Sequence, residues 1–214
     1  MHAYLVVPPG KGPFPAVIWA HGSGGSRTDL LLPATWLSAR RAVGLVVDDP
    51  FERDPTLLTA PDARQRAAVV QEVVDLRRSV DVLSSLPYVD PKRIGFAGLS
   101  LGARVGALLA GAEPRIRAFD FQSGRGASFG PGLDELTWIK RSDARFYLQA
   151  GLRDVYVPHA ELVALIRAAP QPKKVSWYDA GHVPSAAEVA DQLRWLAREL
   201  GLGAPVVRGA VAGP

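Results

Sequence analysis

Residues 95–103 read GFAGLSLGA, and they join an apolar strand pattern at 93–97 to a helical pattern at 101–111. A serine on so tight a turn leaves no room for side chains two residues away on either side, and Gly98 and Gly102 remove that conflict. The turn would place the Ser100 hydroxyl above the carboxyl edge of a sheet, with the Leu101 N–H pointing into the same space. The segment therefore predicts a strand–turn–helix unit that presents Ser100 as a nucleophile.

Short apolar runs alternate with longer helical patterns along the rest of the chain. The predicted strands are 3–7, 16–20, 43–48, 93–97, 116–121, 145–150 and 174–178, and the predicted helices are 30–40, 61–86, 101–111, 158–168 and 184–200. Most of these strands are apolar throughout, as strands buried on both faces are. The alternation predicts an α/β fold with a mostly parallel sheet of about seven strands and helices on both faces.

The ends and loops of this pattern give further expectations. The breaker-rich loop at 8–13 is short enough for a hairpin between the first two strands, so the first strand is expected to be an antiparallel edge. Residues 49–60 and 123–131 are expected to be irregular. The 214 residues suit one domain, which we place at 1–200, and the Gly-, Ala-, Pro- and Val-rich residues 201–214 are expected to form a flexible tail.

A serine nucleophile needs a base, and the chain has only four histidines. His182 lies after the last predicted strand and before the last predicted helix, so it should reach the same sheet edge as Ser100. His21 ends an early strand, and we expect it to support its loop by hydrogen bonding. The sequence therefore favours His182 as the base.

The base in turn needs an acid that fixes its tautomer and orients its ring. Asp154 follows the strand at 145–150 and precedes a helix, which places it at the same edge. Asp120, at the end of the preceding strand, is the competing candidate, while Asp179 and Asp143 are less well placed. We predict Asp154 as the acid.

An oxyanion site is expected after the second strand, where residues 21–25 read HGSGG. Glycines let backbone N–H groups approach a ligand oxygen closely. The N–H of Leu101 would be one donor, and the second would come from Ser23 or from Gly24. A simple glycine turn is the alternative interpretation.

Together these positions resemble the α/β-hydrolase superfamily, and more narrowly its dienelactone-hydrolase-like and prolyl-oligopeptidase-like serine esterases. The resemblance rests on PFPAVI at 13–18 leading into His21-Gly22, VDPKRIG at 89–95 leading into the Ser100 turn, GLRDVYVP at 151–158, and Gly181-His182. The order Ser100, Asp154, His182 is that of nucleophile, acid and base in this superfamily. The resemblance implies a carboxylesterase that cleaves small esters through an acyl-enzyme, with no metal and no organic cofactor.

One difference from dienelactone hydrolases narrows the expected substrate class. Dienelactone hydrolases in the strict sense carry a cysteine at the nucleophile position, whereas this chain has Ser100 and no cysteine at all. Ordinary carboxylic esters are therefore favoured. No large lid insertion is present, and 49–60 and 123–140 are the candidates for a small cover. Their apolar side chains would either line an acyl pocket or pack in the core: Phe51, Leu57, Phe129, Leu133 and Trp138.

Other function classes stay open at this point. A peptidase, amidase or lactone hydrolase would use the same triad, although oligopeptidases usually carry a gating domain for which this chain is too short. A hydrolase-fold protein that binds a ligand without turnover is a second class. A dinucleotide-binding protein is a third, but residues 95–100 lack the Gly-x-Gly-x-x-Gly phosphate loop.

Composition excludes several partners and sites. The 25 basic and 21 acidic residues give a net charge of +4, and they are interleaved instead of clustered, which argues against nucleic acid or an anionic membrane as partner. The absence of cysteine excludes disulfides and thiolate metal sites. The first residues show no leader pattern. We expect a cytoplasmic monomer or homodimer whose partner is a small-molecule ester.

Overall fold

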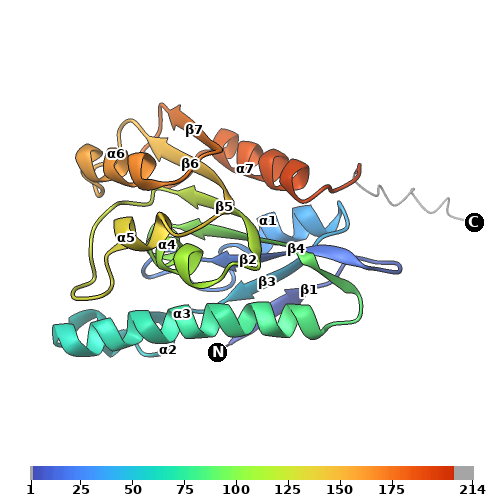
Figure 1. Cartoon of the computed structure of the whole chain (residues 1–214), viewed down its shortest axis with the longest axis horizontal. Coiled ribbons are helices and arrows are strands. Elements are labelled where there is room, and N and C mark those ends of the chain that lie inside the picture. The colour runs from blue at the N-terminus through green and yellow to red at the C-terminus, as the bar shows by residue number, and fades with distance from the viewer. Residues whose placement is uncertain (1, 205–214) are drawn as a thin grey trace, which may run out of the picture.

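The computed structural model describes residues 2–204, and its centre is a single seven-stranded sheet (Figure 1). The strands are β1 (Ala3–Val6), β2 (Phe14–Ala20), β3 (Val43–Val47), β4 (Val89–Leu99), β5 (Ile116–Gln122), β6 (Arg145–Gly151) and β7 (Lys173–Tyr178). Their order across the sheet is β1-β3-β2-β4-β5-β6-β7, and every neighbouring pair except β1 with β3 is parallel. The predicted mostly parallel sheet is confirmed. Of the predicted tail, residues 205–214 lie outside the described residues.

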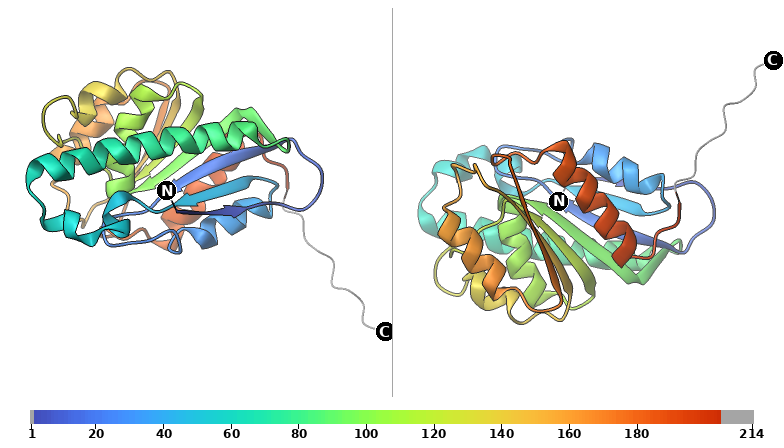
Figure 2. Two further views of the ribbon diagram at one scale, coloured as in Figure 1. Left: turned by 90° about the horizontal axis from the view of Figure 1, so that it is seen from below. Right: turned by 90° about the horizontal axis from the view of Figure 1, so that it is seen from above.

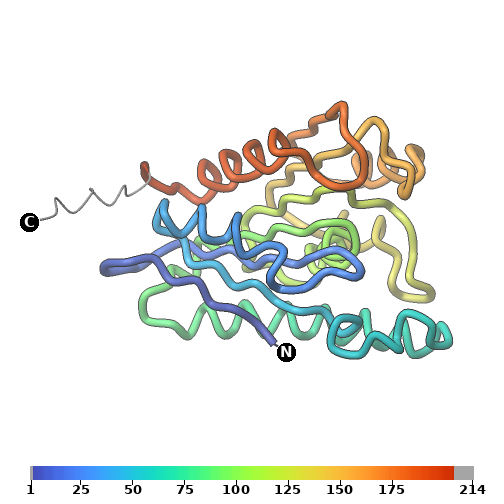
Figure 3. Tube along the Cα trace, turned by 180° about the vertical axis from the view of Figure 1, so that it is seen from behind, coloured from blue at the N-terminus to red at the C-terminus, as the bar shows by residue number. Residues whose placement is uncertain are grey.

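The first strand is an antiparallel edge, but the predicted hairpin between the first two strands is wrong. β1 pairs with β3, with Ala3 opposite Val47 and Val6 opposite Gly44. The edge of β2 that a hairpin would need is taken by β3, which runs parallel to it. The loop at 8–13 therefore reverses the chain but carries it across β3, so that β1 and β2 lie on either side of that strand (Figure 3).

Helices cover both faces of the sheet, as predicted (Figure 2). They are α1 (Leu31–Ser38), α2 (Pro50–Arg53), the 3-10 helix η1 (Pro55–Thr59), α3 (Asp62–Ser85), α4 (Leu101–Ala112), α5 (Glu135–Ile139), α6 (His159–Ala168) and α7 (Ala186–Glu199). On one face lie α1 and α7, and on the other lie α3, α4 and α5, with α6 beside α5. Among residues 2–204, no helix combines the length and the apolar character needed to cross a membrane.

The two faces bury two separate cores because side chains alternate along each strand. On β2, Val17 and Trp19 pack with Trp195 and other residues of the α1–α7 face, whereas Ile18 packs with the residues beneath α3 and α4. All seven residues of β2 are buried. Such two-sided burial explains the continuous apolar runs in the sequence. Because the central strands are parallel, their carboxyl ends meet at one edge of the sheet.

Residues 49–60 were expected to be irregular and instead form two short helices. Asp49 caps α2 by accepting a hydrogen bond from the Glu52 N–H through its side chain, and Asp54 caps η1 in the same way through the Thr56 N–H. Pro50 and Pro55 occupy the first turns, where their missing N–H costs nothing. Aspartate followed by proline is therefore a helix-start signal that does not depend on hydrophobic periodicity.

Candidate active site

Ser100 lies between β4 and α4 in a strained backbone conformation, with φ of 51° and ψ of −108°. Such a conformation costs a non-glycine residue about 1–3 kcal/mol. Two hydrogen bonds hold it in place. The Ser100 N–H donates to the Gln122 carbonyl at 2.9 Å, and the Gly102 N–H donates to the His21 carbonyl at 3.1 Å. The turn is therefore tied to the ends of both neighbouring strands.

The flanking glycines are required by close backbone contacts. A Cβ at Gly98 would lie 2.6 Å from the Gly102 carbonyl carbon, and a Cβ at Gly102 would lie 2.2 Å from the Ala20 carbonyl oxygen. Both contacts are shorter than real Cβ atoms make, and both involve backbone, which cannot move aside cheaply. Any larger residue at either position would displace Ser100.

The structure brings the three predicted side chains into one hydrogen-bonded chain. His182 Nε2 lies 2.9 Å from Ser100 Oγ, and His182 Nδ1 lies 2.8 Å from Asp154 Oδ2. The Asp154 side chain is 1% exposed, whereas that of His182 is 19% exposed. A buried carboxylate beneath a partly open imidazole is the arrangement in which the proton sits on Nδ1 and Nε2 is free to accept one.

Two loops place the acid and the histidine. The Arg153 N–H donates to the Ala180 carbonyl at 2.9 Å, which joins the loop after β6 to the loop after β7. A Cβ at Gly151 would lie 2.2 Å from the Gly181 carbonyl oxygen, so only glycine permits this approach. Asp154 Oδ1 accepts hydrogen bonds from the N–H groups of the two residues before Pro158, which fixes the carboxylate and leaves Oδ2 for His182.

Asp120, the competing acid, lies elsewhere. It is fully buried in β5, on the face covered by α7, and its Oδ1 accepts a hydrogen bond from Gln192 Nε2 at 2.6 Å. Its Oδ2 has no partner among the described residues. Burial raises the pKa of Asp120 to about 8, against the weaker lowering by Gln192. The group is therefore a protonated structural carboxyl at neutral pH.

Replacement of Asp120 by asparagine is expected to stabilise the protein in a pH-dependent way. Its folded pKa lies above that of an unfolded aspartate, so this group's contribution to stability is full below about pH 4 and is lost as the pH rises toward 8. Asparagine does not ionise on unfolding. We expect the advantage of Asp120→Asn over wild type to grow by about 2–4 kcal/mol between pH 5 and pH 8. Urea unfolding at both pH values measures it, and a pH-independent difference would contradict the assignment.

The loop at 21–29 brings Ser23 beside Ser100. A Cβ at Gly22 would lie 3.2 Å from the Ser100 Cβ, so the loop passes close to the nucleophilic turn. Ser23 lines both cavities that open beside Ser100, whereas Gly24, with φ of 75°, lines neither. The backbone N–H groups of Ser23 and Leu101 have no acceptor among residues 2–204. Both are therefore free to donate to an oxygen bound above Ser100.

Two adjoining cavities open at this point. One, of about 480 Å³, contains Ser100 and His182 and reaches outward along Tyr156, Val157 and Val183. The other, of about 440 Å³, extends from Leu101 toward α3 and is lined by Phe51, Leu58, Arg66 and Phe129. Both are bordered by Ser23, Leu101, Arg104 and Arg125. Of the five apolar residues considered for an acyl pocket, Phe51 and Phe129 line the second cavity, while Leu57, Leu133 and Trp138 pack against the core.

Three arginines and one aspartate, Asp62, line the second cavity. Arg104 Nε lies 2.8 Å from the fully buried Glu135, and its guanidinium carbon lies 3.8 Å from the centre of the Phe129 ring. Arg125 Nε is 3.5 Å from Glu161, and Arg66 has no ion pair among the described residues. The apolar walls of this cavity therefore carry three guanidinium groups, two of them paired with glutamates, and one carboxylate.

Two further residues of the site carried no sequence prediction. Ser123 follows β5 with φ of 51°, and its hydroxyl donates to the His182 carbonyl at 2.8 Å, so it fixes the histidine loop. The Tyr156 ring meets the His182 ring edge-on, with centroids 5.3 Å apart. Ser123 could have been predicted as a site residue, because it lies at the carboxyl end of a predicted strand. The contact between the Tyr156 and His182 rings could not, because it depends on the conformations of two loops. No group of three or more His, Asp or Glu side chains within 2–204 is placed to hold a metal ion.

Comparisons with known proteins agree with this architecture. No protein-family model matches the sequence, and no curated protein matches it. Among solved structures, acetyl xylan esterase 1 from Thermoanaerobacterium sp. has a TM-score of 0.75 at 20% identity, covering 93% of this chain and 78% of that one. A dienelactone hydrolase from Anabaena variabilis has a TM-score of 0.71 at 21% identity (93% and 90% covered), and the α/β hydrolase GrgF from Penicillium sp. has 0.74 at 14% (94% and 100%). At such identities the likeness concerns the fold.

Proposed function

We propose that this chain, which has the α/β-hydrolase fold, is a serine hydrolase that cleaves small carboxylic esters through an acyl-enzyme intermediate. The observation that carries the proposal is the continuous chain from Asp154 through His182 to Ser100, with links of 2.8 and 2.9 Å. The same arrangement recurs in serine hydrolases of unrelated fold, where the three groups act as nucleophile, general base and orienting acid.

The proposed reaction follows from this geometry. His182 Nε2 takes the proton as Ser100 Oγ attacks the ester carbonyl, and the imidazolium is stabilised by Asp154. The N–H groups of Leu101 and Ser23 stabilise the oxyanion, and the positive end of α4 adds to the effect. His182 then protonates the leaving alcohol. Water activated by the same histidine frees the acid and restores Ser100.

The position of His182 supports one orientation of the substrate in this proposal. The leaving alcohol must lie within reach of His182 Nε2, which places it in the outer cavity beside Tyr156 and Val183. The acyl group then extends the other way, into the second cavity toward Arg66, with Arg104 at the border of both cavities. An acyl chain that is short and ends in a negative charge suits this cavity better than a long alkyl chain.

This assignment predicts a preference for acidic acyl groups. We expect kcat/KM for monomethyl succinate to exceed that for its neutral isostere methyl succinamate by about 10-fold, the effect of one charge-assisted hydrogen bond. Hydrolysis followed by titration of the released acid measures both rates. Arg66→Gln should reduce the ratio without lowering the rate on the neutral ester. An equal or lower rate on the anionic ester would contradict the assigned orientation.

The reaction class is tested by covalent labelling together with a substrate series. A fluorophosphonate probe should label Ser100, and short p-nitrophenyl esters should be cleaved faster than an amide with the same acyl group. Faster cleavage of the amide would favour the amidase or peptidase alternative. Tight ligand binding without labelling or turnover would favour a hydrolase-fold binding protein.

A further inference from the structure

The loop at 21–29 is fixed to the nucleophilic turn at its first residue. The His21 carbonyl accepts an N–H of that turn at 3.1 Å. His21 Nδ1 donates to the Gly22 carbonyl at 2.8 Å, since a carbonyl can only accept. The same carbonyl accepts the Gly25 N–H at 3.0 Å, which closes a four-residue turn with Ser23 inside it. The near end of the loop is therefore well defined.

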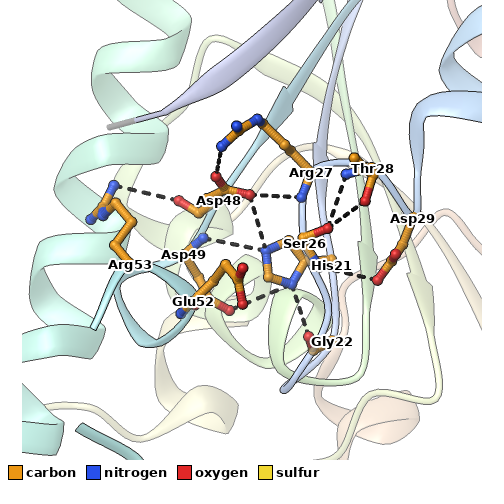
Figure 4. Close-up of polar contacts among 10 residues, drawn as sticks. All are labelled: His21, Gly22, Ser26, Arg27, Thr28, Asp29, Asp48, Asp49, Glu52 and Arg53. Atoms are coloured by element: carbon orange, nitrogen blue, oxygen red, sulfur yellow. Dashed lines mark hydrogen bonds and ion pairs between the residues drawn. The ribbon is translucent and has the colours of Figure 1, made fainter. Parts of the chain in front are cut away.

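The far end of the loop is anchored on Asp48, the residue that follows β3 (Figure 4). The Arg27 N–H donates to Asp48 Oδ1 at 2.7 Å, and the Arg27 guanidinium is paired with Asp48 Oδ2. The Asp48 side chain is 3% exposed. The Ser26 N–H, by contrast, bonds within the loop, to Asp29 Oδ2 at 3.0 Å. Asp48 thus joins this end of the loop to the sheet.

The residues around Asp48 hold it in place and reach the other end of the loop. The Asp48 N–H donates to the His2 carbonyl at 2.9 Å, and the Asp48 carbonyl lies 3.4 Å from Arg53 Nη1. The N–H of the next residue, Asp49, points to His21 Nε2 at 3.4 Å. Both ends of the loop therefore converge on the carboxyl end of β3, as Figure 4 shows.

The two contacts between Arg27 and Asp48 act on different parts of Arg27. Its guanidinium is 30% exposed, so water can replace the carboxylate as its partner. The bond from its N–H instead fixes the backbone itself, four residues after Ser23. A carboxylate acceptor makes such a bond about twice as strong as a neutral acceptor does. The backbone bond is therefore the contact that holds the loop.

We propose that Asp48 is a positioning residue: by accepting the Arg27 N–H, it orients the Ser23 N–H toward the substrate oxyanion. The role of the Ser23 N–H in this statement rests on the proposed function. Asp48 lines neither cavity beside Ser100, so it acts through the backbone and not on the substrate. Because an oxyanion donor acts in the transition state, a displaced Ser23 N–H lowers kcat and leaves KM almost unchanged.

Two variants separate the backbone bond from the ion pair. Asp48→Ala removes both, so kcat on p-nitrophenyl acetate should fall by about 10-fold, while KM changes by less than about 3-fold. Asp48→Asn combined with Arg27→Met removes both charges but keeps an oxygen that accepts the N–H of residue 27. Its kcat should stay within about 3-fold of wild type.

Asp90→Ala is the matched control. Asp90 also accepts one backbone N–H, from Lys92 at 3.0 Å, and is also paired with one guanidinium, through Arg93 Nε at 2.7 Å. It lies near the start of β4, whereas Ser100 follows the end of that strand. Both kcat and KM of this variant should stay within about 2-fold of wild type.

A sulfur substrate distinguishes positioning from a general loss of structure. In p-nitrophenyl thionoacetate, sulfur replaces the carbonyl oxygen and accepts hydrogen bonds only weakly, so turnover depends less on the oxyanion donors. The ratio of kcat on the oxoester to kcat on the thionoester should fall by about 5-fold in Asp48→Ala and stay at the wild-type value in Asp90→Ala. An equal loss on both substrates would overturn the proposal.

The bond itself is tested without substrate, by amide hydrogen exchange in the wild type. Relative to their rates in an unfolded chain, the Arg27 amide should exchange at least about 10-fold more slowly than that of Ser23, which has no acceptor among residues 2–204. If Asp48→Ala does not fold, this comparison and the double variant decide.

Three results would contradict the proposed role of Asp48: similar exchange of the two amides, folded Asp48→Ala with kcat within about 3-fold of wild type, or an equal fall in kcat in Asp48→Ala and the double variant. Failure of the serine mechanism would instead appear as turnover without Ser100, and it would leave the exchange result on Arg27 unaffected.

Discussion

Ser100→Ala is expected to lower kcat on short carboxylic esters by about 10⁴-fold or more. Among residues 2–204 the Ser100 hydroxyl is the only group within hydrogen-bond distance of His182 Nε2, so its removal leaves the histidine without a nucleophile to activate. The oxyanion donors and the cavities remain, because alanine occupies the same strained turn and the flanking glycines are unchanged. KM should therefore change little, and fluorophosphonate labelling should disappear.

The measurement is the kcat of the purified, folded Ser100→Ala variant on p-nitrophenyl acetate. Ser85→Ala is a matched control, since Ser85 is an exposed serine at the end of α3 that bonds only to a carbonyl of its own helix. It should keep wild-type activity and labelling. Turnover by folded Ser100→Ala within 10-fold of wild type would exclude Ser100 as the nucleophile.

The architecture was largely predictable from sequence because its two signals, wholly apolar strands and apolar residues at helical spacing, are both local. Two-sided burial makes a central strand apolar throughout, as in β2 and β3, and the stripe Val69, Leu76, Val80 follows helical spacing. The pairing of β1 was not predictable in this way. A loop of six residues permits a hairpin but does not require one, and only the competition of β3 for the edge of β2 decides the outcome.

The residues of the site also differ in whether the sequence alone could predict them. Ser100, Asp154 and His182 each follow a strand, so topology alone brings them to one edge of the sheet. The contacts of Ser123 and Tyr156 with the histidine loop depend on loop conformations that have no period. The burial of Glu72 could be recognised from sequence, because it lies three residues after Val69 and four before Leu76, on the buried face of α3.

Asp154→Asn is expected to lower kcat by about 10³–10⁴-fold, although the side chain keeps its shape. The N–H groups of Tyr156 and Val157 both donate to Asp154 Oδ1, so the oxygen of an asparagine must occupy that position. Its NH₂ group then faces His182 Nδ1, where the carboxylate oxygen now lies at 2.8 Å. Two donors cannot face one another, so the imidazole must shift its proton to Nε2. That tautomer presents N–H to Ser100 and cannot accept the serine proton.

The matched control for this loss is Asp120→Asn, which makes the same chemical change in the competing acid. It should keep kcat within about 3-fold of wild type, because Asp120 bonds to Gln192 of α7, whereas His182 bonds to Asp154 and Ser100. The kcat of both variants on p-nitrophenyl acetate, compared at one pH, decides between the two acids. A large loss in Asp120→Asn with near-normal turnover in Asp154→Asn would reverse the assignment. Equal modest losses in both would mean that the histidine is oriented chiefly by its loop, through the Ser123 hydroxyl and the packing of Gly151 against Gly181.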